Sequence, residues 1–186
     1  MRLVMQQYLL GPLYLWRNVV NKTEWTPGGD KGRFIKMGYA GGENWMTGHM
    51  YIFNNTCFQT GADGVIEGIG GGNRIVKHAQ SRNNIIHLLD ISSQSISPIG
   101  IDNSFDYDLF NGSVPAGSEA HGIKGIPTYV KGAGYNQTKK TGNFQLSTNS
   151  LGYNSGVVIP ISQMVISVKR RIWVLTKMVG KILNMG

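Results

Sequence analysis

The chain has 186 residues, 41% of them hydrophobic, which is enough for one globular domain with a buried core. Glycine is frequent, with 26 residues, and charged residues make up only 15%, a composition that favours short strands and tight turns over a helical bundle or coiled coil. The single cysteine, Cys57, excludes an internal disulfide and a zinc site built from several cysteines, and its apolar surroundings predict a buried thiol.

The net charge of +8 is concentrated at the C-terminal end of the chain. Residues 161–186 contain five basic residues and no acidic residue, so residues 1–160 hold 13 basic and 10 acidic residues, a net charge of only +3. This mildly basic part gives no reason to expect a nucleic-acid partner. The sequence also shows no apolar run of about 18 residues for a membrane span, and no small-residue cleavage pattern of a signal peptide.

The first third of the chain predicts short strands joined by loops. Residues 1–20 are interpreted as strand pieces of one coil, and residues 22–34 as a polar loop, because Pro27 and the two glycines after it interrupt regular structure. Residues 35–48 predict a short strand and a second glycine-rich turn. Further along, Gly68–Asn73 lacks the Lys-Ser/Thr pair of a phosphate-binding loop and is interpreted as a turn between coils.

A strand-and-asparagine pattern then returns along the chain, at 51–58, 81–89 and 103–112. Its asparagine pairs at 54–55 and 83–84 are 29 residues apart. A recurrence of about 20–30 residues is typical of stacked coils, in which each coil buries its inner face against its neighbours. The loose alternation of apolar residues favours parallel strands covered on more than one side, and asparagines at successive turns predict ladders of side-chain amides.

The region after residue 112 changes character and resembles a known family. The runs FDYDLFNG at 105–112, HGIKGIPTYV at 121–130 and GNFQLSTNSLGYNSG at 142–156 are similar to the closing section of right-handed parallel β-helix proteins of the pectate-lyase-like superfamily. The resemblance covers residues 51–160 and departs from the family pattern at 151–153, where Pro, Ala and Ile are usual.

This resemblance implies an all-β fold over residues 1–160, namely a right-handed parallel β-helix solenoid of about five or six coils. A terminal strand segment would pack across the last coil. The resemblance also implies that the chain is the C-terminal portion of a larger carbohydrate-active protein.

Residues 161–186 do not continue this pattern. Proteins of this kind end on a stretch such as Pro-Asp-Met-Gly-Ala-Tyr-Glu, and that stretch appears when suitable synonymous codons of the tail are read from the third base of Ile161. We therefore hypothesise that the basic apolar tail comes from a single-frame slip and is not the native frame. The alternative is a short basic helix that binds an anionic membrane or nucleic acid, because Val165, Val168 and Ile172 recur at helical spacing.

The resemblance implies a polysaccharide ligand lying along the stack of coils. The loop at 24–33 is the densest polar cluster outside the tail, and long polar loops on a rigid scaffold are common functional sites. Aromatic side chains beside it have flat apolar faces that stack on sugar rings. The predicted substrate-binding residues are Trp25, Asp30, Lys31, Arg33, Tyr39 and Trp45. A solvated turn whose tryptophan covers the edge of the core is the alternative.

Candidate catalytic residues are charged side chains that coil stacking would make neighbours. Asp63 and Glu67 bracket one short run, and Lys77 and Arg82 are expected one coil further along, so that acids and bases would face each other. Charged residues on outward faces are the alternative. β-Elimination from a polyuronide needs a base such as Lys or Arg and a cation, often calcium, beside the carboxylate. Calcium is therefore the one cofactor considered, and no metal ligands are assigned.

Asp106 and Asp108 alternate in a strand and are expected to share a face, as a cation or sugar site requires. Because the resemblance implies that this motif occurs irrespective of chemistry, a structural role of the two residues is favoured. Together these observations predict a carbohydrate-active protein that binds or cleaves a polysaccharide. A non-catalytic glycan-binding or cell-surface structural β-helix is the alternative. We expect a monomer without a nucleic-acid or membrane partner unless the tail is genuine, and a secreted or cell-surface location for the full-length relative.

Overall fold

The computed structural model describes residues 3–4, 12–23, 33–36, 49–59, 67–89, 91, 94–131, 135–136, 138–139 and 141–160. These residues form strands and turns and contain no helix, so the all-β class predicted from the sequence is confirmed for them. The tail at 161–186 lies outside the described residues.

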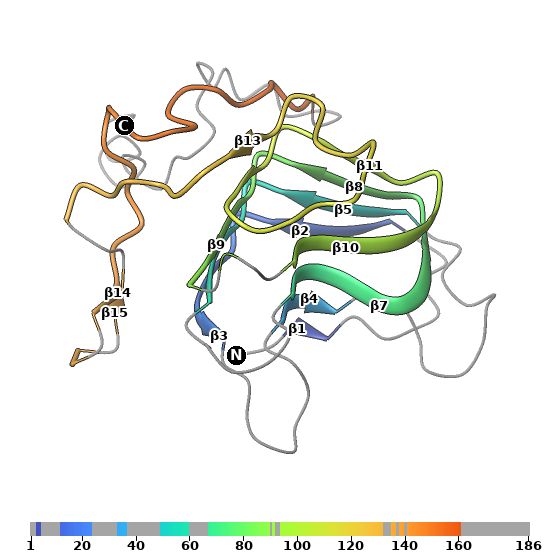
Figure 1. Ribbon diagram of the computed structural model, residues 1–186, viewed down its shortest axis with the longest axis horizontal. Coiled ribbons are helices and arrows are strands. Elements are labelled where there is room, and N and C mark those ends of the chain that lie inside the picture. Colours follow the sequence, from blue (N-terminus) through green and yellow to red (C-terminus); the bar gives the residue numbers. More distant parts are fainter. Residues whose placement is uncertain are drawn as a thin grey trace, which may run out of the picture.

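Three parallel sheets make up the body of the fold (Figure 1). The first sheet has the order β1–β4–β7–β10, formed by Leu3–Val4, Arg33–Lys36, Glu67–Lys77 and Gln94–Ile101. The second sheet has the order β2–β5–β8–β11, formed by Leu13–Trp16, Met50–Phe53, Ala79–Arg82 and Ser104–Phe105. The third sheet has the order β3–β6–β9–β12–β13, formed by Val19–Thr23, Thr56–Gln59, Ile85–Leu88, Leu109–Phe110 and Ile123–Lys124. A separate antiparallel pair joins β14 (Tyr135–Asn136) to β15 (Thr141–Gly142).

The chain visits the three sheets in the same order on each pass. β1, β2 and β3 lie in the first, second and third sheets, and the next strands repeat this order, so that each strand pairs with the strand three positions further along the chain. We call one such pass a rung. The described residues contain four rungs, β1–β3, β4–β6, β7–β9 and β10–β12, and β13 adds a further strand to the third sheet. Side chains at the same register therefore form columns that run from rung to rung.

The first three rungs turn the corner between the second and third sheets within two residues, and the fourth rung within three, at 106–108. The next-to-last residue of each corner has a positive φ: Arg17 57°, Asn54 57°, Asn83 58° and Tyr107 62°. A left-handed residue changes the chain direction sharply, at a cost of about 1–2 kcal/mol for an L-residue, and Asn adopts this conformation more readily than most residues. The repeated corner therefore explains why asparagines recur at this place in the sequence.

The last residues of these corners form a ladder of side chains: Asn18, Asn55, Asn84 and Asp108. Asn55 Oδ1 accepts hydrogen bonds from the backbone N–H and from Nδ2 of Asn18, both at 3.0 Å, and Asn84 Oδ1 accepts the same two groups of Asn55 at 2.9 Å. Asp108 Oδ1 accepts the backbone N–H and Nδ2 of Asn84 at 2.7 and 2.9 Å. Since Asn55, Asn84 and Asp108 are fully buried, the neighbouring rung supplies partners that water cannot. The predicted amide ladder is confirmed.

Apolar side chains from all three sheets form one core between them. Ile35, Ile69 and Ile96 occupy one register position of the first sheet on successive rungs, and all three are buried. They share a cluster with Ile52 of the second sheet and Cys57 of the third, which confirms the buried thiol. Burying an isoleucine stabilises a fold by about 1.5–3 kcal/mol, so each column of this kind favours continued stacking of rungs.

The third sheet is covered on its outer face as well, whereas the second sheet is not. All four residues of β9 are buried, because Tyr129 and Leu146 from the segment after β13 pack on Ile85 and Leu109. In β5 and β8, by contrast, buried residues alternate with half-buried ones, so every second side chain of these strands faces outward.

Gly68–Asn73 is not a turn between rungs, so that interpretation is wrong. The run lies inside β7, where pairing with β10 shifts register between Ser97 and Ile99. A Cβ at Gly68 would overlap the Ile86 side chain and the Ser95 carbonyl oxygen. The glycines here allow close packing and an irregular stretch of strand. From the sequence alone, such a stretch looks the same as a glycine-rich turn.

Replacing Asn84 by alanine tests the ladder. The side chain takes part in hydrogen bonds with both neighbouring rungs, and its removal leaves buried amide groups unpaired. We expect Asn84→Ala to lower the free energy of unfolding by about 3 kcal/mol in urea titrations, against about 1 kcal/mol or less for Asn18→Ala at the exposed end of the ladder. Equal losses in the two variants would contradict the ladder.

His87 gives the fold an acid-sensitive point. Its ring is buried beside Phe58, with Nδ1 3.1 Å from the Tyr129 hydroxyl, and burial lowers the pKa of His87 from 6.5 to about 4. The unfolded chain therefore binds a proton below pH 6.5 that the folded chain refuses until about pH 4. The contribution of neutral His87 to the free energy of unfolding is fully present above pH 6.5. It falls by about 3 kcal/mol as the pH drops to 4. Urea unfolding of His87→Phe at pH 7 and 4.5 should show a smaller acid loss than the wild-type chain; an unchanged loss would refute the assignment.

Candidate functional site

The structure places only some of the residues singled out from the sequence. Trp25, Asp30, Lys31, Tyr39, Trp45 and Asp63 lie outside the described residues, so their assignments stay predictions. Arg33 and Glu67 begin β4 and β7 and are paired in register on neighbouring strands of the first sheet. Lys77 is the half-buried last residue of β7, and Arg82 the half-buried last residue of β8.

The expectation that Lys77 and Arg82 lie one coil beyond Glu67 is wrong. Glu67 and Lys77 are the two ends of one strand, β7, and Arg82 belongs to the second sheet of the same rung. The glycine-rich run continues the strand and is not a boundary between coils, so Glu67 and Lys77 are not brought together by stacking of one coil on the next. Among the predicted catalytic residues, Arg82 is the one whose side-chain hydrogen bonds the described structure shows.

The outer face of the second sheet carries two columns of outward side chains, which we call the outer strip. One column contains Tyr14, Tyr51, Gln80 and Ser104, and the other contains Trp16, Phe53 and Arg82. Between them the inward residues Leu15, Ile52, Ser81 and Phe105 are buried. The strip spans four strands, about 14 Å at 4.8 Å per strand. It is aromatic on β2 and β5 and polar on β8 and β11.

The aromatic half of the strip is ordered by contacts between rungs. The Tyr14 and Tyr51 rings stack with centroids 5.0 Å apart, and Tyr51 also contacts Phe53 at 5.7 Å. The Arg17 guanidinium lies 4.5 Å from the centre of the Trp16 ring. Tyr14 is 61% exposed, although its neighbour in β2, Leu15, is buried. Exposed aromatic groups held in a row are suited to stacking on flat apolar faces of a ligand.

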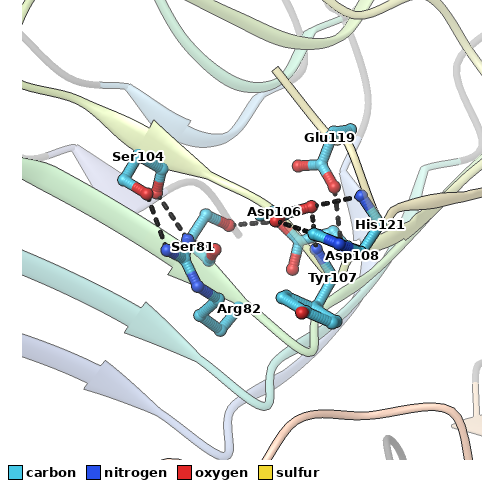
Figure 2. A network of polar contacts seen from close by, with 8 residues as sticks. All are labelled: Ser81, Arg82, Ser104, Asp106, Tyr107, Asp108, Glu119 and His121. Atoms are coloured by element: carbon cyan, nitrogen blue, oxygen red, sulfur yellow. Dashed lines mark hydrogen bonds and ion pairs between the residues drawn. The ribbon is translucent and has the colours of Figure 1, made fainter. Parts of the chain in front are cut away.

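The polar half of the strip centres on Arg82. Its Nη1 donates to the carbonyl oxygens of Ser81 and Ser104 at 2.6 and 2.7 Å, and its Nη2 donates to Ser104 Oγ at 2.6 Å (Figure 2). A guanidinium has five N–H groups, so Nε–H and one Nη2–H remain without a partner among the described residues. These two groups lie on one edge of the guanidinium and form the fork that binds a carboxylate.

A second polar cluster lies at the adjoining corner (Figure 2). Asp106 Oδ1 accepts the His121 backbone N–H at 2.6 Å, and Asp106 Oδ2 lies 2.8 Å from His121 Nδ1. The Tyr107 and His121 rings are stacked 4.6 Å apart. Although burial opposes the charge, the hydrogen bonds from His121 and Tyr107 hold the pKa of Asp106 below its ordinary value. The His121 side chain is 62% exposed, so this cluster is accessible from solvent.

Asp106 and Asp108 do not share a face, contrary to the expectation from their spacing. Left-handed Tyr107 between them reverses the alternation, so that Asp106 faces outward and Asp108 enters the core. Asp108 ends the asparagine ladder and also accepts a hydrogen bond from Ser81 Oγ. Its backbone N–H donates to Glu119 Oε2 at 3.1 Å. Burial raises the pKa of Asp108, although its hydrogen bonds with Ser81 and Asn84 lower it. Burial and then the Asp108 charge raise the pKa of Glu119 more strongly.

The described residues contain no group of three or more His, Cys, Asp or Glu that is able to hold a metal ion, and the calcium expectation stays a prediction. Nor does this part of the chain contain a helix long and apolar enough to cross a membrane. What it does contain is a strip with aromatic groups at one end and a positioned guanidinium at the other.

Searches against family models, curated proteins and solved structures found no significant match to the chain. The outer strip was not predicted from the sequence, except for Arg82. A signal for it is present in LYLW at 13–16 and MYIF at 50–53, whose aromatic residues fall at alternate positions before each corner. The aromatic spacing becomes informative only once the two runs are aligned on Asn18 and Asn55.

Proposed function

We propose that the chain is part of a right-handed parallel β-helix protein that binds a polysaccharide along the outer strip. The fold part of this proposal is supported by the cyclic order of three parallel sheets and by the asparagine ladder, both of which stacked coils require. The resemblance of 105–156 to the closing section of such proteins agrees with it.

The observation that carries the functional part is the composition of the outer strip. Tyr14 and Tyr51 present apolar ring surface, while Gln80, Arg82 and Ser104 present hydrogen-bonding groups on the same face. A sugar polymer has the matching pattern, because each sugar offers an apolar C–H face and a polar rim, repeated along its length. The Arg82 fork further favours a polymer with carboxylates, such as a polyuronide.

Binding is better supported than cleavage. The guanidinium of Arg82 donates three hydrogen bonds to neutral oxygens and has further N–H donors, so it is suited to holding an anion. A non-catalytic glycan-binding role of a secreted or cell-surface protein is therefore the function we propose. Cleavage of a polyuronide by β-elimination is the competing function.

Calorimetric titration of the chain with a polyuronide and with a neutral glucan tests this proposal. We expect Tyr14→Ala to weaken binding of the polyuronide about tenfold, through loss of aromatic contact, and Arg82→Gln to weaken it tenfold or more, through loss of a charged hydrogen bond. Arg82→Gln should affect the neutral glucan less. Ile126→Ala, which removes an exposed apolar side chain outside the strip, is the matched control and should bind as the wild-type chain does.

Two results would count against the proposal. Wild-type affinity in both Tyr14→Ala and Arg82→Gln, with folding verified by circular dichroism, would remove the strip as the site. Release of unsaturated products from the polyuronide, with or without calcium, would replace binding by β-elimination as the function.

A further inference from the structure

Outside the outer strip, Glu119 has an unusual backbone conformation and a buried carboxyl group with an unpaired oxygen. Its φ is 60°, a left-handed conformation in which Gly or Asn is usual. Its side chain is buried, with Oε2 accepting the Asp108 backbone N–H, while Oε1 has no hydrogen-bond partner within the described part of the chain. A Cβ at Gly122 would overlap Glu119 Oε2 and the Phe110 ring, so the carboxyl group is closely enclosed.

The charges around Glu119 do not stabilise an anion there. Asp108 and Asp106 are the acids that raise its pKa, and His121 is directed at Asp106. Arg82 donates to Ser81 and Ser104, and no Lys or Arg of the described residues forms an ion pair with Glu119 or Asp108. A buried carboxylate oxygen without a donor or cation costs several kcal/mol, and a proton on that oxygen removes most of this cost.

The neighbouring carboxyl group has the opposite surroundings. Asp108 accepts hydrogen bonds from the backbone N–H of Asn84, from Asn84 Nδ2 and from Ser81 Oγ. Three donors stabilise a charged carboxylate, so a proton shared by the pair belongs on Glu119. The raised pKa of Glu119, caused first by burial and then by the Asp108 charge, agrees with this geometry.

We propose that Asp108 and Glu119 share one proton that latches the turn at 113–122 onto the end of the asparagine ladder, and that loss of this proton releases the turn. At its start the turn is held by the Ser113 carbonyl oxygen, which accepts the N–H groups of Ser95 and Ile96. Its far end is attached through the Glu119 N–H, which donates to the Phe105 carbonyl oxygen, and through His121 to Asp106. β13 follows directly and pairs with β12 through the Ile123 N–H, which donates to the Asp108 carbonyl oxygen. Opening of the latch therefore loosens the last strand of the third sheet. This inference does not depend on the proposed function.

The pH dependence of this latch has a definite sign. In the opened turn Glu119 regains its ordinary pKa of 4.5, whereas in the closed turn the pKa is raised to about 9. Below pH 4.5 both states hold the proton and the latch is fully closed. Above about pH 6, where Asp108 is charged in the closed turn, opening releases the Glu119 proton, so the opening equilibrium rises tenfold for each pH unit up to about pH 9.

Amide hydrogen exchange of the full chain, followed by NMR from pH 5 to 9, tests the latch. We compare the Ile123 amide in the wild-type chain and in Glu119→Gln at the same pH, so that the intrinsic exchange chemistry cancels. Gln keeps the shape of a protonated glutamate but does not titrate. We expect the wild-type Ile123 amide to lose protection about tenfold per pH unit relative to the variant. The Ile85 amide, which donates to the Asn55 carbonyl oxygen inside the stack, should show no such difference.

A parallel pH dependence of Ile123 exchange in the two proteins would overturn the proposal. A second measurement needs no variant: the carboxyl ¹³C shift of Glu119 in the wild-type chain should still report the protonated form at pH 7. A titration of Glu119 near its ordinary value would likewise overturn the latch, whether or not Glu119→Gln folds.

Discussion

Each rung can bury its inner side chains only if the chain turns from the second sheet into the third at the same place every time. The line of Asn18, Asn55, Asn84 and Asp108 imposes this condition. A one-residue slip would place an apolar side chain among the buried amides and leave those amides unpaired, at a cost of about 1–3 kcal/mol for each group. The ladder thus fixes the register of the sheets that meet at this corner, and the columns of the fold follow from it.

The outer strip is a consequence of that register. Because the second sheet stays aligned over four strands, Tyr14 lies over Tyr51, and Phe53 lies in the column of Arg82. The third sheet is aligned in the same way, but Tyr129 and Leu146 cover its outer face at β9 and β12, so the outward residues there stabilise the fold and are not offered to a ligand. Of these two sheets, the second is the one whose outward side chains stay half-exposed. The proposed glycan site rests on that difference in burial.

The recurring asparagines were enough to predict strands, parallel stacking and the amide ladder, because buried amides at a left-handed corner have few substitutes. The pattern did not show where the ladder begins and ends. Arg17–Asn18 and Tyr107–Asp108 occupy the same corner without an asparagine pair, and only the coordinates align them with Asn54–Asn55. The sequence predicts a turn at Gly68–Asn73 because glycine is common both in turns and where strands pack closely. Since the run is part of β7, Lys77 lies on the same strand as Glu67 and not on the next coil. The Asp108–Glu119 contact joins the corner at 106–108 to the turn at 113–122 through tertiary packing, which sequence spacing does not encode.

The central claim is that side-chain amides of successive rungs are hydrogen-bonded to each other inside the fold. The most direct measurement is hydrogen exchange of the asparagine side-chain NH₂ groups by NMR. The account predicts that Nδ2 of Asn55 and Asn84 exchanges at least about a hundredfold more slowly than that of exposed Asn149, because exchange requires the rungs to separate. Exchange of Asn55 and Asn84 at the rate of Asn149 would contradict the ladder and, with it, the aligned strip.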